Sequence, residues 1–208
     1  AARQGLESPE FAVRSFDLAA LGATSAPTSE AQVKDEPSLP LLPDAQTIDW
    51  GFLRGLGNAP SLVLETTRGT VTLQLLTAEA PLTVQTVARL ALDGHYDGVP
   101  FHRVLPNFMA QTGDVQHGDM EDGFNIRMAG TGGSDKPDLQ AEFSDVSFQA
   151  GTVGMARAQD PDSANSQFFI DLAPATFLDG EYTVVGQLIE GWDVLNSIKK
   201  GDADANGA

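Results

Sequence analysis

The pattern of apolar and polar positions changes near residue 60. From Ser61 onward, short apolar-rich runs are separated by turns containing Gly, Pro or Asp, and at 70–76 apolar residues alternate with polar ones. Such period-two alternation places successive side chains on opposite faces of an extended strand. The runs predict strands at 62–67, 70–76, 99–104, 108–111, 151–158, 167–172 and 182–189.

Two segments show helical spacing instead. Pro81 stands where the first turn of a helix tolerates proline, and Val84, Val87 and Leu90 follow at intervals of three. A second apolar stripe runs from Trp192 to Ile198. Many short strands with only two helices are typical of a mainly β domain, and they favour a closed antiparallel barrel.

Residues 1–60 have a different composition and predict a largely irregular N-terminal extension before a single domain at 61–208. The segment 22–43 is rich in Pro, Ser and Thr and predicts an extended linker. Apolar residues within 11–21 fit either a short amphipathic helix or, as the favoured alternative, a tail that docks weakly or not at all. The large apolar residues of 48–56 predict that the end of the extension packs on the domain.

The charge and the cysteine count exclude several classes of function. Lys and Arg number 12 against 29 Asp and Glu, which gives a formal net charge of −17. This charge argues against nucleic acid or an anionic membrane as the main partner, because phosphate binding depends on basic patches. No apolar run reaches the ~18 residues of a membrane span. The chain has no Cys, which excludes disulfides, thiolate nucleophiles and Cys-ligated zinc.

The candidate chemistry lies in two strand segments. In Phe101–Asp114, alternation places His102 on the face opposite Arg103, and Arg, Met, Gln and Phe gather in a mixed surface unlike a plain core strand. The second segment is Ser166–Asp171, preceded by small residues such as Ala156 that allow another backbone to approach closely.

These segments resemble the cyclophilin family of peptidyl-prolyl cis–trans isomerases. The matching motifs are Phe101-His-Arg-Val, Phe108-Met-Ala-Gln, Gly130-Thr-Gly-Gly133, Met155-Ala, Ser166-Gln-Phe-Phe-Ile and Leu178-Asp-Gly180. They occur in order over roughly two-thirds of the chain, which is far more specific than one motif alone. The resemblance implies an eight-stranded barrel capped by two helices, with the site on its outer surface. The loop around 117–127 is arranged differently from the common form.

The resemblance also implies the roles of individual residues. Arg103 matches the catalytic arginine. The positions that match the proline pocket and the peptide-holding groups are Phe108, Met109, Gln111, Ala156, Arg157, Gln167, Phe169, Phe177, Leu178 and Tyr182. Phe177 stands where many members have Trp, Tyr182 replaces a frequent His, and Arg157 a frequent Asn. Since Phe lacks the indole N–H donor, we expect cyclosporin, the family's characteristic ligand, to bind weakly.

The function predicted is isomerisation of X–Pro bonds in protein substrates, assisting their folding. Rotation breaks no bond, so the reaction requires no nucleophile, general base, metal or other cofactor. An always protonated guanidinium aimed at the twisted nitrogen acts only in the transition state. The alternatives are a non-catalytic proline-peptide-binding or chaperone module, and a scaffold whose extension docks a partner.

Three other motifs favour plainer interpretations. His102 is expected to be a hydrogen-bonded structural residue. The acidic stretch with His117, Asp119, Glu121 and Asp122 matches no known cation loop and predicts a solvated turn. The run Gly130-Thr-Gly-Gly133 lacks the Lys and the strand–helix context of a phosphate loop.

Location, assembly and the end of the barrel are predicted more coarsely. We expect a monomer of bacterial type, exported or tethered to the cell envelope, because the chain starts at Ala1, lacks Cys and has an acidic, Pro-rich leading segment; the alternative is cytoplasmic. The segment after Ile198 is polar where the family usually adds a last strand. We therefore expect either a longer natural chain or coverage of the edge at 62–67 by part of 48–56.

Overall fold

The computed structural model describes residues 46–120 and 127–201. The predicted helix within 11–21 and the linker at 22–43 lie outside these ranges, as do Glu121 and Asp122. The described residues contain seven strands, three α-helices and one short 3-10 helix. None of these helices is long and apolar enough to cross a membrane.

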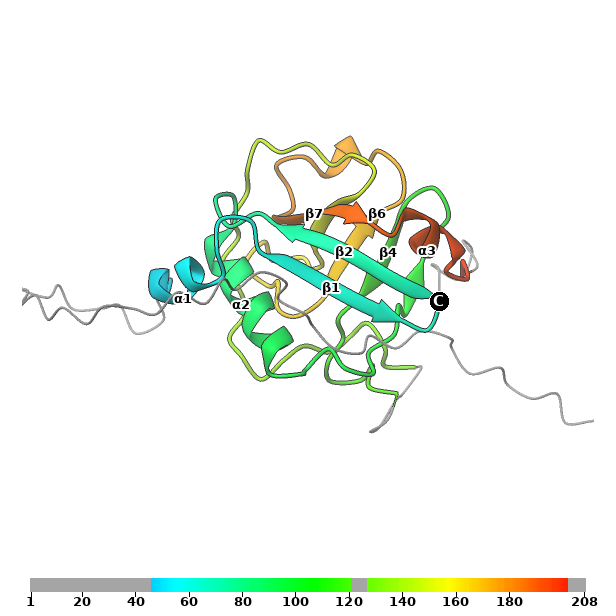
Figure 1. Ribbon diagram of the computed structural model, residues 1–208, viewed down its shortest axis with the longest axis horizontal. Coiled ribbons are helices and arrows are strands. Elements are labelled where there is room, and N and C mark those ends of the chain that lie inside the picture. The colour runs from blue at the N-terminus through cyan, green and yellow to red at the C-terminus, as the bar shows by residue number, and fades with distance from the viewer. Residues whose placement is uncertain (1–45, 121–126, 202–208) are drawn as a thin grey trace, which may run out of the picture.

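The seven strands form one antiparallel sheet that curls around the core (Figure 1). The strands are β1 (Ser61–Thr66), β2 (Gly69–Leu75), β3 (Arg103–Val104), β4 (Met109–Thr112), β5 (Thr152–Met155), β6 (Phe168–Asp171) and β7 (Val184–Glu190). Their order across the sheet is β1-β2-β7-β5-β6-β4-β3. The prediction of a mainly β fold is confirmed, and every predicted strand is present.

Two strands, β3 and β5, are each four residues shorter than predicted. β3 occupies only the end of the predicted strand at 99–104, because Pro100 has no N–H to donate to a neighbouring strand. β5 stops at Met155. Beyond it, the N–H of Ala156 still donates to the carbonyl of Gln167, which directly precedes β6, whereas that of Ala158 donates to the Ser163 hydroxyl in the following loop, where the chain leaves the sheet.

Within the described ranges the sheet has two free edges, β1 and β3, so the eighth strand and the closed barrel are not seen there. The segment after α3 (Trp192–Ser197) does reach one edge, where the Gly201 N–H donates to the Val104 carbonyl at 2.9 Å. The architecture of the described residues is a curled half-barrel of seven strands.

The stretch at 48–56 folds as α1 (Trp50–Gly55) and packs against α2 (Pro81–Leu92) (Figure 1). Leu53 is buried in the main core, which confirms that this end of the extension packs on the domain. Its coverage of the β1 edge is not observed, because the backbone of α1 bonds within the helix and pairs with no strand.

The core has two parts on opposite faces of the sheet. The larger cluster lies under α2 and includes Phe168 and Ile170 of β6. The smaller cluster lies on the outer face and consists of Met109, Phe148, Phe169, Ala175, Leu178 and Val184. Both faces of β6 are therefore buried, which explains the unbroken apolar run at 168–170 in the sequence.

The N-terminus of α2 is fixed by a residue that is distant in sequence. Its N-cap residue, Ala80, has no side chain able to accept a hydrogen bond. The Glu142 carboxylate instead accepts from the backbone N–H groups of Leu82 (3.0 Å) and Thr83 (2.8 Å) and from the Thr83 hydroxyl. This contact joins α2 to the long segment between β4 and β5.

Candidate active site

A row of paired residues across four strands builds the outer face of the sheet. Arg103 of β3 pairs with Gln111 of β4, Gln111 pairs with Phe169 of β6, and Phe169 pairs with Gly154 of β5. Paired residues in antiparallel strands project to the same face, so the pairing brings their side chains together. At Gly154 a Cβ atom would lie 2.5 Å from Phe169 Cζ and 2.6 Å from Phe148 Cε1. Only glycine therefore leaves room for the Phe169 ring.

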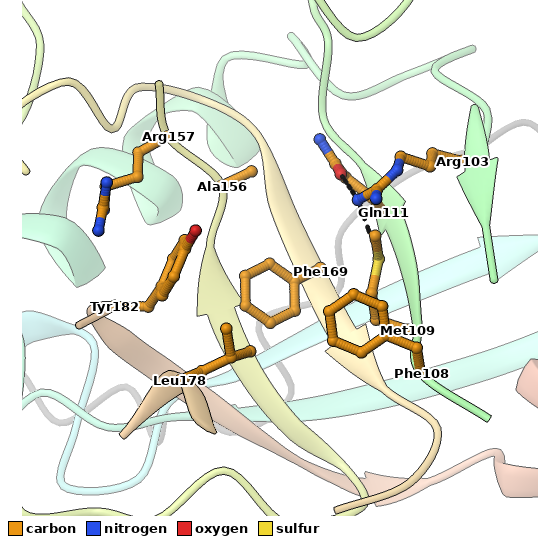
Figure 2. Close-up of a pocket in the computed structure, with 9 residues that line it drawn as sticks. All are labelled: Arg103, Phe108, Met109, Gln111, Ala156, Arg157, Phe169, Leu178 and Tyr182. Atoms are coloured by element: carbon orange, nitrogen blue, oxygen red, sulfur yellow. Dashed lines mark hydrogen bonds between the residues drawn. The ribbon is translucent and has the colours of Figure 1, made fainter. Parts of the chain in front are cut away.

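A cleft of about 120 Å³ opens above this row. It is lined by Arg103, Phe108, Met109, Gln111, Ala156, Arg157, Phe169, Leu178 and Tyr182 (Figure 2). All nine belong to the set implied by the resemblance. Met109, Phe169 and Leu178 are buried, so the floor is apolar, whereas Arg103 and Gln111 stand together at one side.

The other two residues of that set lie beside the cleft. Gln167 accepts a hydrogen bond from Gln111 and lines an adjoining cleft of about 450 Å³ together with the glycine run 130–133. Phe177 lies on the 3-10 helix η1 (Thr176–Leu178) with 70% of its surface exposed, and its ring centroid is 5.5 Å from that of Phe108. Phe177 thus extends the aromatic rim but does not line the cleft.

Arg103 is half-buried and points along the rim of the cleft. Its Nη1 donates to Gln111 Oε1 at 3.2 Å and lies 4.0 Å from Met109 Sδ (Figure 2). Burial lowers the pKa of Arg103, and electrostatic attraction to Tyr182 across the cleft opposes this shift. An arginine remains protonated in such surroundings, so the cleft has a permanent donor beside an apolar floor.

The Arg157 side chain builds the opposite wall, although the resemblance implied mainly a backbone contact there. Its guanidinium stacks over the Tyr182 ring at 4.4 Å from the centroid. It also donates to the carbonyls of Ala158, Gln159 and Glu181. Arg157 therefore joins two loops that meet at the cleft and holds Tyr182 in place.

His102 does not line the cleft, as alternation predicts. Both ring nitrogens are buried, and among the described residues no hydrogen bond of ordinary geometry reaches either of them, although the Gln167 side chain and the Pro100 backbone lie close enough to favour the charged ring weakly. Burial lowers the pKa of His102, which the charge of Asp114 only partly offsets, so the ring is neutral near pH 7. In the described ranges, no group of three or more His, Cys, Asp or Glu residues is arranged to hold a metal ion.

Sequence reasoning missed two residues around the cleft. Phe148 stacks on Phe169, with ring centroids 5.9 Å apart and an interplanar angle of 22°. Asp114 is fully buried and accepts four backbone hydrogen bonds, two of them from the glycine run 130–133. Phe148 shows no local signal, because Phe169 lies 21 residues further along the chain. Gln116 and His117 lie within three residues of Asp114 and could have indicated a local turn, but Gly130 and Gly132 lie 16 and 18 residues away, so the link to the glycine run could not be seen.

Comparison with known proteins adds to this geometry. Residues 61–208 match the family model described as cyclophilin type peptidyl-prolyl cis-trans isomerase/CLD. A probable peptidyl-prolyl cis-trans isomerase of Brucella suis is 52% identical over 148 residues, which cover 71% of this chain and 76% of the relative. A peptidyl-prolyl cis-trans isomerase of Synechococcus elongatus is 40% identical over 142 residues, 67% of this chain and 89% of that protein.

A solved structure with the same fold agrees with these relatives. It is a cyclophilin-type isomerase of Cryptosporidium parvum, crystallised in the presence of the dipeptide Ala-Pro. It has a TM-score of 0.60 and 25% sequence identity, and the match covers 71% of this chain and 89% of that one. The chain belongs to the family of cyclophilin-type peptidyl-prolyl cis–trans isomerases.

Proposed function

We propose that this isomerase rotates X–Pro bonds of flexible protein segments in the cleft beside Arg103. The observation that carries the proposal is the position of a protonated guanidinium at the rim of an apolar cleft of about 120 Å³. The Cryptosporidium relative was crystallised with a proline-containing dipeptide, which supports a proline site in this fold.

The chemistry follows from the resonance of the amide. Rotation about a peptide bond has a barrier of ~18–20 kcal/mol, because twisting removes the partial double bond between carbon and nitrogen. In the twisted state the nitrogen regains its lone pair and accepts a hydrogen bond. A donor from Arg103 stabilises that state but not the planar amide, which is the condition for raising kcat. The apolar floor holds the proline ring while the preceding carbonyl turns.

The remaining cleft residues have supporting roles in this proposal. Gln111 holds the Arg103 guanidinium by accepting its hydrogen bond. The small side chain of Ala156 lets the substrate backbone approach the sheet. Tyr182 supplies a hydroxyl at the far side of the ring, and its orientation is set by the stacked Arg157.

Replacement of Arg103 tests the proposal. Arg103→Ala should lower kcat/KM by ~10²–10³, about 2.7–4 kcal/mol for a lost transition-state donor, without unfolding the protein. Arg103→Lys should recover little, because an ammonium lacks the planar fork. Exchange NMR on a short Xaa-Pro peptide measures the rate, and Arg54→Ala on exposed α1 is the matched control. Activity of Arg103→Ala within twofold of wild type would falsify the assignment.

We further propose that the natural substrates are folding proteins and that cyclosporin binds only weakly. Exposed Phe177 offers a ring without a donor, and a missing hydrogen bond costs ~0.5–1.5 kcal/mol. Phe177→Trp should tighten cyclosporin binding about tenfold in a calorimetric titration. If the Trp variant binds cyclosporin no better than wild type, the donor argument fails.

The substrate class is tested by a refolding assay, in which the isomerase should accelerate the proline-limited refolding of a model protein.

Location, assembly and closure of the sheet are also proposals. A cysteine-free chain with an acidic, Pro-rich leading segment supports an exported or envelope-tethered monomer, which cell fractionation and sedimentation would test.

The Gly201–Val104 hydrogen bond supports closure by an eighth strand, because it brings the segment after α3 to the β3 edge. Slow amide exchange along the outer edge of β1 would agree with closure, and fast exchange would contradict it.

A further inference from the structure

A continuous chain of hydrogen bonds runs from Arg103 to the glycine run 130–133. Arg103 Nη1 donates to Gln111 Oε1 (3.2 Å), and Gln111 Nε2 donates to Gln167 Oε1 (2.8 Å). Gln167 Nε2 then donates to the Gly132 carbonyl (2.7 Å). A guanidinium only donates and a carbonyl only accepts, so both ends require the same orientation of the two amides. All three hydrogen bonds therefore run in the same direction, from the Arg103 guanidinium to the Gly132 backbone carbonyl.

The glycine run that ends this chain is held by Asp114. The Asp114 side chain is fully buried. Its Oδ1 accepts from the N–H groups of Gln116 (3.1 Å) and His117 (2.9 Å). Its Oδ2 accepts from the N–H groups of Gly130 (2.7 Å) and Gly132 (3.1 Å). One carboxylate thus joins the turn after β4 to the glycine run.

Gly132 is the residue at which the two sets of bonds meet. Its N–H donates to Asp114 and its carbonyl accepts from Gln167. A Cβ atom at this position would lie 2.5 Å from Asp114 Oδ1, so the close approach requires glycine. Because both groups belong to one residue, the carboxylate determines where the carbonyl lies.

We propose that Asp114 is a positioning residue for the isomerisation. Its carboxylate fixes the glycine run and, through Gln167 and Gln111, the direction in which Arg103 presents its guanidinium. The inference rests on the proposed catalytic role of Arg103. A carboxylate is required because it accepts at both oxygens. An amide in the same place turns an NH2 group toward two of the four N–H donors and loses their bonds with little change in volume.

A carboxylate elsewhere in the fold offers a matched control. Glu142 also accepts backbone N–H bonds, at the start of α2, and its carboxylate bonds to no residue that lines the cleft. Asp114→Asn and Glu142→Gln therefore make the same chemical change at two anchors. Both should lower the melting temperature, but only the first should alter Arg103.

The experiment compares these two variants by two measurements. The side-chain N–H resonance of Arg103 in ¹H–¹⁵N spectra reports its hydrogen bonding, and exchange NMR on an Ala-Pro peptide gives kcat and KM. Asp114→Asn should shift that resonance and lower kcat by up to ~10²-fold, the effect of a misplaced catalytic group, with a smaller change in KM. Glu142→Gln should leave the resonance, kcat and KM as in wild type.

The two measurements test separately whether Asp114 orients Arg103 and whether that orientation matters for the reaction. An unshifted Arg103 resonance in folded Asp114→Asn overturns the positioning role. A shifted resonance with unchanged kcat shows that Asp114 influences Arg103 but overturns its role as a positioning residue for the isomerisation, whereas the catalytic role of Arg103 is tested separately by Arg103→Ala. If Asp114→Asn does not fold, Gly132→Ala takes its place, because the added methyl pushes the glycine run off the carboxylate while Asp114 remains. An unshifted resonance in that variant also overturns the proposal.

Discussion

At the scale of single residues, the cleft depends on the absence of a side chain at Gly154. Gly154 lies in β5 directly under the Phe169 ring, and a methyl group there would overlap both Phe169 and Phe148. Gly154→Ala should displace the ring that forms the floor, lowering kcat/KM by about tenfold or more and stability by ~1–3 kcal/mol. Peptide kinetics and chemical denaturation measure the two effects.

The matched control for this change is Gly55→Ala in α1, where a methyl group would meet no atom within 4 Å. This variant should keep wild-type kinetics. Wild-type kcat/KM in Gly154→Ala would mean that the floor adapts to the added methyl group and that the close packing is not required.

Asp171 makes the stability of the protein depend on pH. It lies in β6 opposite Met109, its side chain is fully buried, and neither carboxylate oxygen has a hydrogen-bond partner among the described residues. Burial raises the pKa of Asp171 to about 7. An unfolded Asp titrates near ~3.9, so between these values the unfolded chain has released a proton that the folded protein still binds. The free energy of unfolding should therefore fall as pH rises from about 4 to 7.

Asp171→Asn removes this titration. The melting temperature of the variant relative to wild type should rise as pH increases from 4.5 to 8, because only the wild type must bury a charge at the higher pH. Thermal melts at the two pH values measure this difference. A difference that does not change with pH would show that the carboxyl is solvated or paired in solution.

At the scale of elements, Leu53 is the one fully buried side chain of α1, and Phe52 packs beside it, partly buried, against the same core and under Arg89 of α2. Leu53 is 3% exposed within the main core, whereas Trp50 on the same helix is 52% exposed. The ion pair between Asp49 and Arg89 is half-exposed and contributes little. A helix of six residues is not stable alone, so it depends on this docking.

Leu53→Ala should therefore release α1 from α2. We expect faster amide exchange throughout α1 and a lower melting temperature, with kcat/KM unchanged because α1 does not line the cleft. Hydrogen exchange measured by mass spectrometry follows the helix directly. Trp50→Ala is the control and should leave α1 protected. Equal exchange in the two variants would argue against the docking role of Leu53.

At the scale of the whole molecule, the charge of −17 should select among substrates. The negative field attracts cationic peptides and repels anionic ones, which changes the rate of encounter. An Ala-Pro peptide flanked by Lys should have a kcat/KM roughly several-fold above its Glu-flanked analogue at low salt, with similar kcat. The ratio should shrink as salt is added, since the screening length falls from ~30 Å at 0.01 M to ~10 Å at 0.1 M. A ratio independent of salt would indicate local contacts instead.

Much of the fold and of the cleft could be predicted from local pattern. Short apolar-rich runs between turn residues located every strand, because apolar runs and turn signals are properties of neighbouring residues. The motifs around Arg103, Phe108 and Phe169 placed nine residues that the structure brings to one cleft. The precise placement of the remaining two residues is set by distant parts of the chain. Gln167 is turned toward Gln111 by bonds across 56 and 35 residues, and Phe177 is left on the rim by the course of η1.

The sequence by itself determined the mainly β class, the order of the strands along the chain and the residue types of an isomerase site. These depend on periodicity, turn residues and motifs, which are local. Only the tertiary structure decided how the side chains act together. It set the single direction of the hydrogen bonds from Arg103 to the Gly132 carbonyl, the burial of Asp114, the stack of Arg157 on Tyr182, and an Asp171 carboxyl that meets no hydrogen-bond partner among the residues described. Hydrogen bonds and burial join residues far apart in the chain, and no local pattern records which of them will meet.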